Sequence, residues 1–380
     1  MSRRVSTEVV TLSANTSWYL FNFRAATIRR LLSEGYRVVC LSPEDSYSAR
    51  LSELGCEWWP VHMDNAGSNP LKDAWLVLQF WRHYRRLRPA AALHFTIKNN
   101  VYGTWAARVA GVPAINNVSG LGTAFTRKGF VAAVARQLYR LSLPLAARVF
   151  CQNVDDRQLL VSRRIVSPSQ LALLPGSGVD LVRFSPLLRQ PHPGPFRFLY
   201  AGRLLADKGL YELIAAFRAL RKAGHEAELW LCGFAGVSNV SAITEADLEA
   251  WGREPFVTWL GPTDAIESVM AQIDCIVLPS YYGEGVPRSL LEAAAMGLPA
   301  ITTDAPGCRH VVEDGFNGLL CKARDPDSLQ ASMTQVLLMT AEELERMGSN
   351  GRARVEERFS EEVVVDATLA AVRECNENPR

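Results

Sequence analysis

Residues 274–297 read DCIVLPSYYGEGVPRSLLEAAAMG, and this stretch decides the fold. An apolar run at 275–278 leads into a turn rich in tyrosine and glycine, and a helical segment follows. We expect the helix to begin at Pro287 and to end at Gly297, because proline at the first helical position and glycine after the last are typical boundaries. A buried strand that enters a helix through a short loop is the repeating unit of a parallel α/β sheet.

The same alternation extends through the rest of the chain. Strands are expected at 8–12, 37–41, 91–95, 114–117, 149–152 and 171–174, and then at 198–200, 228–232, 257–260, 275–278, 300–302 and 318–320. Helical periods separate most of these runs, and a proline-rich linker at 184–195 divides them into two sets. The pattern predicts right-handed βαβ units and mainly parallel sheets.

We therefore predict an α/β protein with two Rossmann-like domains that face each other across a cleft. The first domain is expected at 1–185 and the second at 196–359, with a C-terminal helix in 360–380 that packs back on the first. In open sheets of this kind, ligands bind at the carboxyl ends of the strands.

The net charge of +2 hides a strong asymmetry between the two halves of the 380-residue chain. Residues 1–190 contain 24 basic and 11 acidic residues, a balance of +13, whereas residues 191–380 contain 17 and 28, a balance of −11. Uneven surface charge without a function is one interpretation. The other is that the first half faces an anionic partner, such as a phosphorylated acceptor or a lipid surface.

The eight cysteines form no Cys-x-x-Cys pair, and several lie in apolar runs. They are expected to be small buried side chains in a reducing compartment, not disulfides or metal ligands. The sequence has no visible signal peptide and no apolar run of about 18 residues. These features predict a cytoplasmic protein, peripheral on the inner face of the plasma membrane.

Four charged residues are expected to meet at one sheet edge. Arg203 and Lys208 follow the first strand of the second domain, and Glu284 and Glu292 follow the strand at 275–278. Arginine and lysine bind phosphate oxygens, and a helix N-terminus attracts anions. The two carboxylates would accept hydrogen bonds from hydroxyl groups on either side of a diphosphate. A ligand with hydroxyl, diphosphate and hydroxyl in series is a nucleotide sugar.

The motifs around these residues resemble family 4 glycosyltransferases, which have the GT-B fold. In the second half, the segments that carry the resemblance are 201–209, 278–299 and 304–309. In the first half, the segments 18–24, 116–122 and 174–180 resemble a bacterial branch that extends undecaprenyl-diphosphate-linked precursors of capsules, O-antigens and glycoprotein glycans. The resemblance covers essentially the whole chain.

The resemblance implies a role for each matching residue. Arg203 and Lys208 would hold the donor diphosphate, Glu284 would bind hydroxyls of the donor sugar, and Glu292 would bind the ribose. The backbone amides that would seat sugar and phosphate lie in Gly285, Val286, Pro287, Arg288, Ser289 and Leu290, of which Pro287 itself lacks an N–H. The family implies retention of anomeric configuration, for which leaving-group charge would be neutralised by the two cations and a helix dipole. No cofactor is expected.

The first domain departs from the wider family at its first loop. Many members have two glycines there, whereas residues 13–17 of this chain read SANTS. Asn15 and Thr16 are candidates for contact with acceptor or sugar, and Lys98 and Asn99 are candidates for the acceptor phosphate. His94, at the end of a strand, is either a catalytic residue that points into the cleft or a strand-end histidine whose hydrogen bonds are satisfied by backbone.

No metal site is expected. Asp325 and Asp327 match an Asp-x-Asp pattern, but Pro326 between them and the helical run after them favour a helix cap. Two basic and aromatic segments, 81–88 and 126–140, are either core-facing helices with solvated basic sides or helices that dock on an anionic membrane. No nucleic-acid recognition module is present.

The sequence thus predicts a metal-independent, retaining glycosyltransferase. It would move a sugar, an N-acetylhexosamine, from a UDP-sugar to a polyprenyl-diphosphate-linked glycan. Two alternatives remain: a sugar-nucleotide epimerase of the same architecture, which needs acid/base carboxylates and no acceptor, and a non-catalytic subunit that binds a sugar nucleotide.

Overall fold

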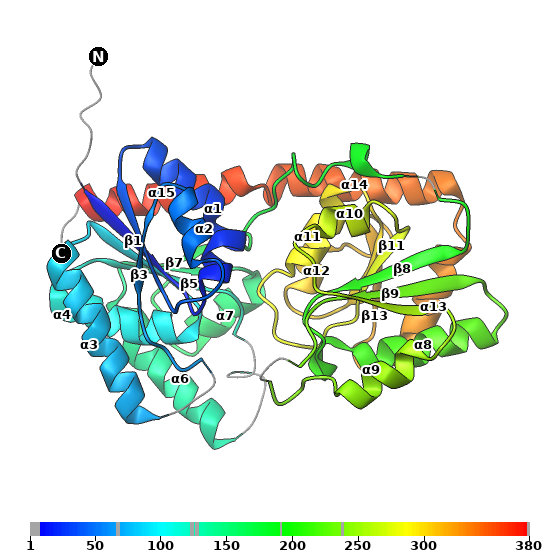
Figure 1. Ribbon diagram of the computed structural model, residues 1–380, viewed down its shortest axis with the longest axis horizontal. Coiled ribbons are helices and arrows are strands. Elements are labelled where there is room, and N and C mark those ends of the chain that lie inside the picture. The colour runs from blue at the N-terminus through cyan, green and yellow to red at the C-terminus, as the bar shows by residue number, and fades with distance from the viewer. Residues whose placement is uncertain are drawn as a thin grey trace, which may run out of the picture. The chain divides into compact units, whose positions relative to one another are not determined.

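The chain forms two compact units, one of residues 1–177 with 361–380 and one of residues 178–360. A computed structural model describes residues 8–65, 69–121, 125, 129–190, 192–236 and 239–377. The α-helices and several of the strands are labelled in Figure 1. The proline-rich segment 184–195, expected as the linker between the domains, belongs to the second unit in this division.

The first unit is built on a parallel sheet of seven strands, ordered β3-β2-β1-β4-β5-β6-β7. Its strands are β1 (Val9–Ser13), β2 (Arg37–Ser42), β3 (Glu57–Pro60), β4 (Ala91–Phe95), β5 (Ala114–Val118), β6 (Arg148–Cys151) and β7 (Leu171–Leu173). Its α-helices are α1 (Ser17–Ser33), α2 (Ser48–Glu53), α3 (Pro70–Leu87), α4 (Thr104–Ala110), α6 (Phe130–Ser142), α7 (Val154–Ser162) and α15 (Glu361–Glu377). A π-helical turn, η1 (Asn99–Gly103), precedes α4, and a 3-10 turn, η2 (Leu143–Leu145), follows α6.

Two hydrophobic clusters lie in the first unit, one on each face of its sheet. One contains Leu76, Phe80 and Tyr139, from α3 and α6. The other contains Leu20 and Leu369, from α1 and α15. Helices α3, α4 and α6 therefore cover one face, and α1, α2 and α15 cover the other.

The second unit has a parallel sheet of six strands, ordered β10-β9-β8-β11-β12-β13. Its strands are β8 (Phe196–Ala201), β9 (Ala227–Cys232), β10 (Val257–Gly261), β11 (Cys275–Leu278), β12 (Ala300–Thr303) and β13 (Gly318–Cys321). Its α-helices are α8 (Leu210–Lys222), α9 (Glu245–Gly252), α10 (Ile266–Met270), α11 (Arg288–Ala295), α12 (Cys308–Val311), α13 (Pro326–Leu337) and α14 (Ala341–Arg358). Two 3-10 turns are η3 (Pro186–Leu188) and η4 (Ala206–Lys208).

The two sheets confirm the predicted class of two Rossmann-like α/β domains. Each expected strand is present, and each differs from its prediction by at most two residues at either end. Strand β3 was not expected, because its four residues include two tryptophans that are only half-buried and end in a proline. The eight cysteines are all buried thiols, as predicted.

Candidate functional site

The second unit places its charged candidates at the point where the strand order reverses. From β8 the chain continues outward to β9 and β10, whereas from β11 it continues in the opposite direction to β12 and β13. Strands β8 and β11 are neighbours, with Phe198 opposite Cys275. The loops after two such strands diverge and leave a crevice, which is where open α/β sheets bind their ligands. Arg203 and Lys208 follow β8, and Glu284 follows β11.

Lys208 and Glu284 form an ion pair at this reversal point. The Lys208 Nζ lies 2.6 Å from Glu284 Oε1, and the two side chains are only 12% and 13% exposed. The Ser280 hydroxyl donates to the same carboxylate oxygen over 3.1 Å. The structure thus brings together two of the residues that the sequence predicted for one site, and it adds Ser280, which sequence reasoning missed.

The loops after β8 and β11 approach each other closely at Gly209. This residue has a φ of +78°, and a Cβ atom there would lie 2.1 Å from the carbonyl oxygen of Pro279. Only glycine fits both the left-handed backbone and the contact. Gly209 therefore allows the segment that carries Lys208 to lie against the loop that carries Glu284.

Arg203 is the exposed cation of the group. The Tyr200 hydroxyl donates to the Arg203 carbonyl over 2.7 Å, which fixes the backbone at this position. Burial raises the pKa of the Tyr282 phenol, and the nearby Arg203 guanidinium, which is hydrogen-bonded to it, acts in the opposite direction. Tyr282 thus links Arg203 to the loop after β11.

Helix α11 begins one residue later than predicted. Pro287 is the N-cap, with φ −66° and ψ 118°, and the helix starts at Arg288. The extended ψ angle at Pro287 is the reason, because it turns the chain into the helix only at the next residue. The amides of Ser289 and Leu290 lie in the first turn, where helix geometry offers no intrahelical acceptor and the dipole is positive.

Glu292 points its carboxylate at Arg288, four residues earlier in α11. Arg288 Nε donates to Glu292 Oε1 over 2.7 Å, with side-chain exposures of 15% and 12%. Burial raises the pKa of Glu292, and the Arg288 guanidinium partly offsets this shift. Arg288, which the sequence proposed only for its backbone amide, therefore also orients the carboxylate proposed for the ribose.

Gly307 is a second residue that sequence reasoning did not assign to the site. It has a φ of +84°, and a Cβ atom there would lie 2.5 Å from the Gly285 carbonyl oxygen and 2.7 Å from that of Glu284. The loop after β12 therefore lies directly against the loop that carries Glu284 and Gly285. A Pro-Gly turn at 306–307 was the available signal, since such dipeptides mark tight turns.

The first unit has a strand-order reversal of its own, between β1 and β4. Asn15 and Thr16 follow β1, and Lys98 and Asn99 follow β4, so both candidate pairs lie at this reversal. Thr16 caps α1, because its hydroxyl accepts from the Tyr19 amide over 3.0 Å. The Asn15 carbonyl accepts from the Asn65 side chain, 2.9 Å away. Thr16 was not recognised as a helix cap from the sequence.

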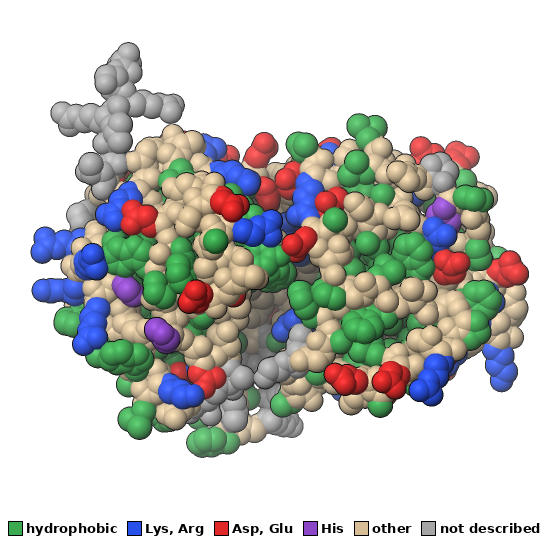
Figure 2. Space-filling model, viewed as in Figure 1, with side chains coloured by type: hydrophobic (Ala, Val, Ile, Leu, Met, Phe, Trp, Pro, Cys, Tyr) green, Lys and Arg blue, Asp and Glu red, His purple; other side chains and the backbone are tan. Residues whose placement is uncertain are grey.

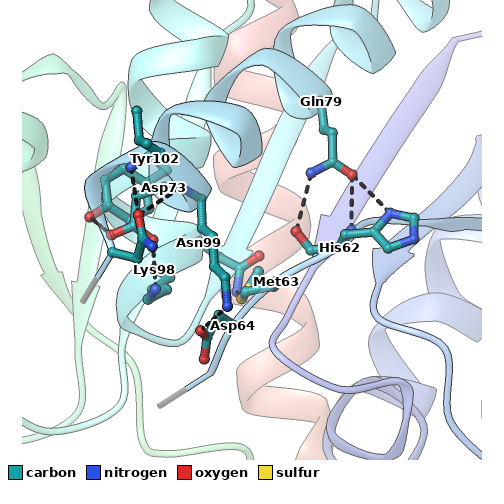
Figure 3. Close-up of polar contacts among 11 residues, drawn as sticks. His62, Met63, Asp64, Asp73, Gln79, Lys98, Asn99 and Tyr102 are labelled. Atoms are coloured by element: carbon teal, nitrogen blue, oxygen red, sulfur yellow. Dashed lines mark hydrogen bonds and ion pairs between the residues drawn. The ribbon is translucent and has the colours of Figure 1, made fainter. Parts of the chain in front are cut away.

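Lys98 is held by a carboxylate from α3, as Figure 3 shows. Its Nζ lies 2.6 Å from Asp73 Oδ1, and the Tyr102 hydroxyl donates to Asp73 Oδ2 over 2.8 Å. Burial and Asp73 both raise the pKa of Tyr102, so its hydroxyl stays protonated and remains a donor. Asp73 was missed, because a separation of 25 residues from Lys98 gives no sequence signal.

Asn99 is fully buried beside a strained residue. Its Nδ2 donates to the Thr96 hydroxyl over 2.8 Å, whereas its Oδ1 has no hydrogen-bond partner among the described residues. Thr96 has a φ of +70°, which is rare for a β-branched residue and is typical of backbone held in place by function or by packing. Asn99 thus holds the turn after β4.

His94 lies in the core instead of pointing toward a ligand. The ring is 0% exposed, its Nε2 lies 2.9 Å from the Tyr84 hydroxyl and its Nδ1 lies 2.9 Å from Asn116 Oδ1. Burial lowers its pKa to about 4. Both ring nitrogens thus contact side chains, which corrects the expectation of a catalytic ring that points into the cleft. The alternative, a ring whose hydrogen bonds are satisfied by backbone groups, is not observed among the described residues either.

Two further features bear on the predicted site. Asp325 caps α13, because its Oδ1 accepts from the Ser328 amide over 2.9 Å, which confirms the cap interpretation of the Asp-x-Asp pattern. Within the described ranges, none of the helices is both long enough and apolar enough to span a membrane.

Comparisons with known proteins agree with this architecture. Residues 24–176 match the family described as "Glycosyl transferase 4-like domain", and residues 189–354 match "Glycosyl transferases group 1". The chain is 26% identical, over 92% of its length and 94% of the relative's, to the N,N'-diacetylbacillosaminyl-diphospho-undecaprenol alpha-1,3-N-acetylgalactosaminyltransferase of Campylobacter jejuni. It is also 26% identical, over 70% and 71% of the two chains, to the Escherichia coli UDP-Gal:alpha-D-GlcNAc-diphosphoundecaprenol alpha-1,3-galactosyltransferase.

A solved structure with low sequence identity to this chain also supports the fold. The Anabaena protein HepE, in complex with UDP and glucose, superposes with a TM-score of 0.78 at 17% identity, over 97% of this chain and all of that one. The two matched families cover residues 24–176 of the first unit and most of the second unit, and they agree with the motifs found in the sequence. The chain belongs to the glycosyltransferases of family 4, with the GT-B fold.

Proposed function

We propose that the protein transfers an N-acetylhexosamine from its UDP-linked form to a polyprenyl-diphosphate-linked glycan, with retention of anomeric configuration and without a metal ion. The observation that carries this proposal is the Lys208–Glu284 pair, 2.6 Å apart at the strand-order reversal of the second unit. It combines a cation for phosphate with a carboxylate for sugar hydroxyls in one place.

The proposed donor follows from the second unit and from the relatives. Arg203 and Lys208 are two cations for a diphosphate, and Glu284 and Glu292 are two carboxylates for hydroxyls. The E. coli relative is named for a UDP-sugar donor, and the HepE structure contains UDP and glucose. The C. jejuni relative is named for transfer of N-acetylgalactosamine, which supports an N-acetylhexosamine here.

The proposed acceptor follows from the same two relatives, because both are named for sugars linked to undecaprenol through a diphosphate. In the first unit, Lys98 is the candidate for its phosphates, and Asn15 and Thr16 lie beside it in the sheet order. Asn99 is buried and its Oδ1, which has no partner among the described residues, can only accept, so it supports the turn that carries Lys98. With such an acceptor, the proposal includes a peripheral location of the enzyme at the inner face of the plasma membrane.

The proposed chemistry rests on neutralising the leaving UDP. As the bond between sugar and phosphate breaks, negative charge develops on the diphosphate, and Arg203, Lys208 and the first turn of α11 stabilise it. These fixed positive groups take the place that a metal ion has in other transferases. Glu284 is paired with Lys208 and accepts from Ser280, so it suits hydroxyl binding better than nucleophilic attack. We therefore favour displacement on one face of the sugar, with the acceptor hydroxyl passing its proton to the leaving phosphate.

A UDP-release assay tests the proposal. The purified chain is incubated with UDP-N-acetylhexosamines, with or without a short-chain prenyl-diphosphate saccharide, in buffer with EDTA. UDP release that needs the acceptor, and an α-linked product by NMR, are expected. Epimerised donor without acceptor would show the epimerase alternative to be correct, and donor binding without turnover would show a non-catalytic subunit.

A further inference from the structure

The first unit contains an arginine-lined hollow outside the candidate site. Its volume is ≈ 230 Å³, and its lining comes from α6 and from the segment after α7: Ala133, Arg136, Gln137, Arg140, Arg163 and Ile165. Three guanidinium groups at one hollow match phosphate oxygens, because arginine keeps its charge and offers a planar fork of donors. Among the described residues, no carboxylate forms an ion pair with Arg140 or Arg163.

An exposed apolar ridge lies beside this hollow on α6. Phe130 is 84% exposed, Val134 41% and Leu141 54%, whereas Tyr139 is 1% exposed and packs in the core. At about 100° per residue, the three exposed positions fall within about 40° of one another around the helix, opposite Tyr139. The exposed side of α6 therefore carries an apolar stripe, next to the exposed polar residues Gln137 and Arg140 that line the hollow, where such a side usually carries polar residues alone.

The sequence around α6 is strongly basic, although Lys98 is paired with Asp73 and Arg148 with Glu374. From Ala74 to Val154 the sequence has 11 lysines and arginines and no aspartate or glutamate. This stretch includes α4, α6 and most of α3, which cover the same face of the sheet. Lys and Arg side chains gather over α3 and α4 in the view of Figure 2. The face is therefore complementary to a negatively charged surface.

We propose that the exposed side of α6 docks on an anionic phospholipid bilayer, with a lipid phosphate in the arginine hollow and Phe130, Val134 and Leu141 at the acyl boundary. A basic helix with an apolar ridge suits the interface between headgroups and chains. Neither a free phosphate nor a nucleic acid would explain the ridge, because neither offers an apolar layer. The inference deepens the proposed function, since it rests on an acceptor that is carried by a prenyl chain in a membrane.

Vesicle co-sedimentation of the full chain tests the inference. Binding to phosphatidylcholine vesicles that contain phosphatidylglycerol is expected, with weaker binding to phosphatidylcholine alone and at high salt. The double variant Arg140→Ala/Arg163→Ala should bind about 25-fold more weakly, about fivefold for each arginine near an anionic surface. Phe130→Ser should lower binding about tenfold, because a large apolar side chain no longer enters the acyl layer.

Two control variants match these changes elsewhere. Arg29→Ala removes an exposed arginine from α1, on the opposite face of the sheet, and Leu338→Ser removes an apolar side chain that is 69% exposed in the second unit. Both should keep parent binding. Equal losses in the controls, or parent binding by the hollow and ridge variants, would overturn the inference. The inference would also be overturned if Arg140→Ala/Arg163→Ala lost the binding of inorganic phosphate but bound vesicles as the parent does.

Turnover on a water-soluble, short-chain acceptor separates this inference from the proposed function. The hollow and ridge variants should keep parent turnover there, because they change only docking. If the parent chain binds vesicles but shows no turnover, the docking site stands and the proposed transferase function is wrong. If the parent chain is active but does not bind vesicles, the proposed function stands and the docking site is wrong.

Discussion

At the scale of single residues, Lys208 is the group on which the donor site depends. Its ammonium group lies 2.6 Å from Glu284 and is only 12% exposed, so a neutral replacement leaves a carboxylate without its cation and a diphosphate without a counter-charge. We predict that Lys208→Ala lowers kcat for sugar transfer about 100-fold or more, as loss of a charge-stabilising group does in other enzymes. The initial rate of UDP release measures this change.

The matched control is Lys222→Ala, which removes an exposed lysine from the end of α8 in the same unit. It should keep the parent rate, and both variants should retain the parent circular dichroism spectrum. A Lys208→Ala protein with the parent rate would remove this residue from the site.

His94 makes the stability of the first unit depend on pH. Burial lowers its pKa from the ordinary 6.5 to about 4, so the folded protein keeps the ring neutral while the unfolded chain takes up a proton at higher pH. Stability is therefore fully present above about pH 6.5 and is lost as the pH falls toward 4. The loss amounts to about 3 kcal/mol, because each unit of pKa shift corresponds to about 1.4 kcal/mol.

The urea midpoint, followed from about pH 7 to about pH 4, measures this dependence. We predict that His94→Gln is less stable at neutral pH but has a flatter profile, since it cannot be protonated. His225→Gln, at a half-buried position between α8 and β9, should keep the parent slope. An unchanged slope in His94→Gln would show that another group controls the acid response.

The sequence identified the charged groups of the candidate site better than their partners. Arg203, Lys208 and Glu284 follow strand ends, and strand ends can be read from apolar runs. Ser280 and Asp73 could not be assigned in this way. A single polar side chain that pairs with a charged residue leaves no periodic pattern in the sequence. The burial of His94 was also beyond the sequence, since its partners Tyr84 and Asn116 come from α3 and β5.

At the scale of elements, Gly307 fixes the position of the loop that carries Glu284. A methyl group there would lie 2.5 Å from the Gly285 carbonyl oxygen, and its φ of +84° adds strain for any other residue. We predict that Gly307→Ala displaces the loop and raises the KM for the donor about tenfold, because the Glu284 carboxylate and the start of α11 move together. Donor-dependent kinetics measure the effect.

Gly315→Ala is the control for backbone strain alone. Gly315 has a φ of +71°, but a Cβ atom there has no atom within 4 Å. It should lose about 1 kcal/mol of stability and keep the parent KM. If both variants shift KM equally, the contact between Gly307 and the loop is not the cause.

Regular elements were predictable because their patterns are local. Strands β4 and β11 match their expected bounds at both ends, since each is an apolar run that ends at polar or turn residues. The π-helical turn η1 was not predictable, because its five buried residues, Asn99–Gly103, depend on packing against the sheet. A Cβ atom on Gly103 would lie 2.7 Å from His94 Nε2, so this turn is fitted to the histidine ring and not to a sequence period.

At the scale of the whole molecule, the first unit is assembled from both ends of the chain. Helix α15 packs against α1 and β4, and Val364, Leu369 and Val372 belong to the same buried cluster as Leu20. An ion pair joins Arg373 to Glu34 over 2.8 Å at the surface of this contact. The first unit therefore lacks part of its core until the last residues are present.

This discontinuity predicts that a chain shortened to residues 1–360 loses stability in one unit only. Removal of α15 exposes a cluster that includes Leu369 and Val372, which are 3% and 0% exposed. Each large apolar side chain lost from a core costs about 2–5 kcal/mol, comparable with the stability of a whole domain. Limited proteolysis with mass spectrometry should show rapid cleavage within residues 8–177, while the second unit survives as a resistant fragment. A Val363→Ala protein of full length is the control, because this residue of the same helix is 38% exposed. Equal resistance of both units in the shortened chain would show that α15 is dispensable for the core of the first.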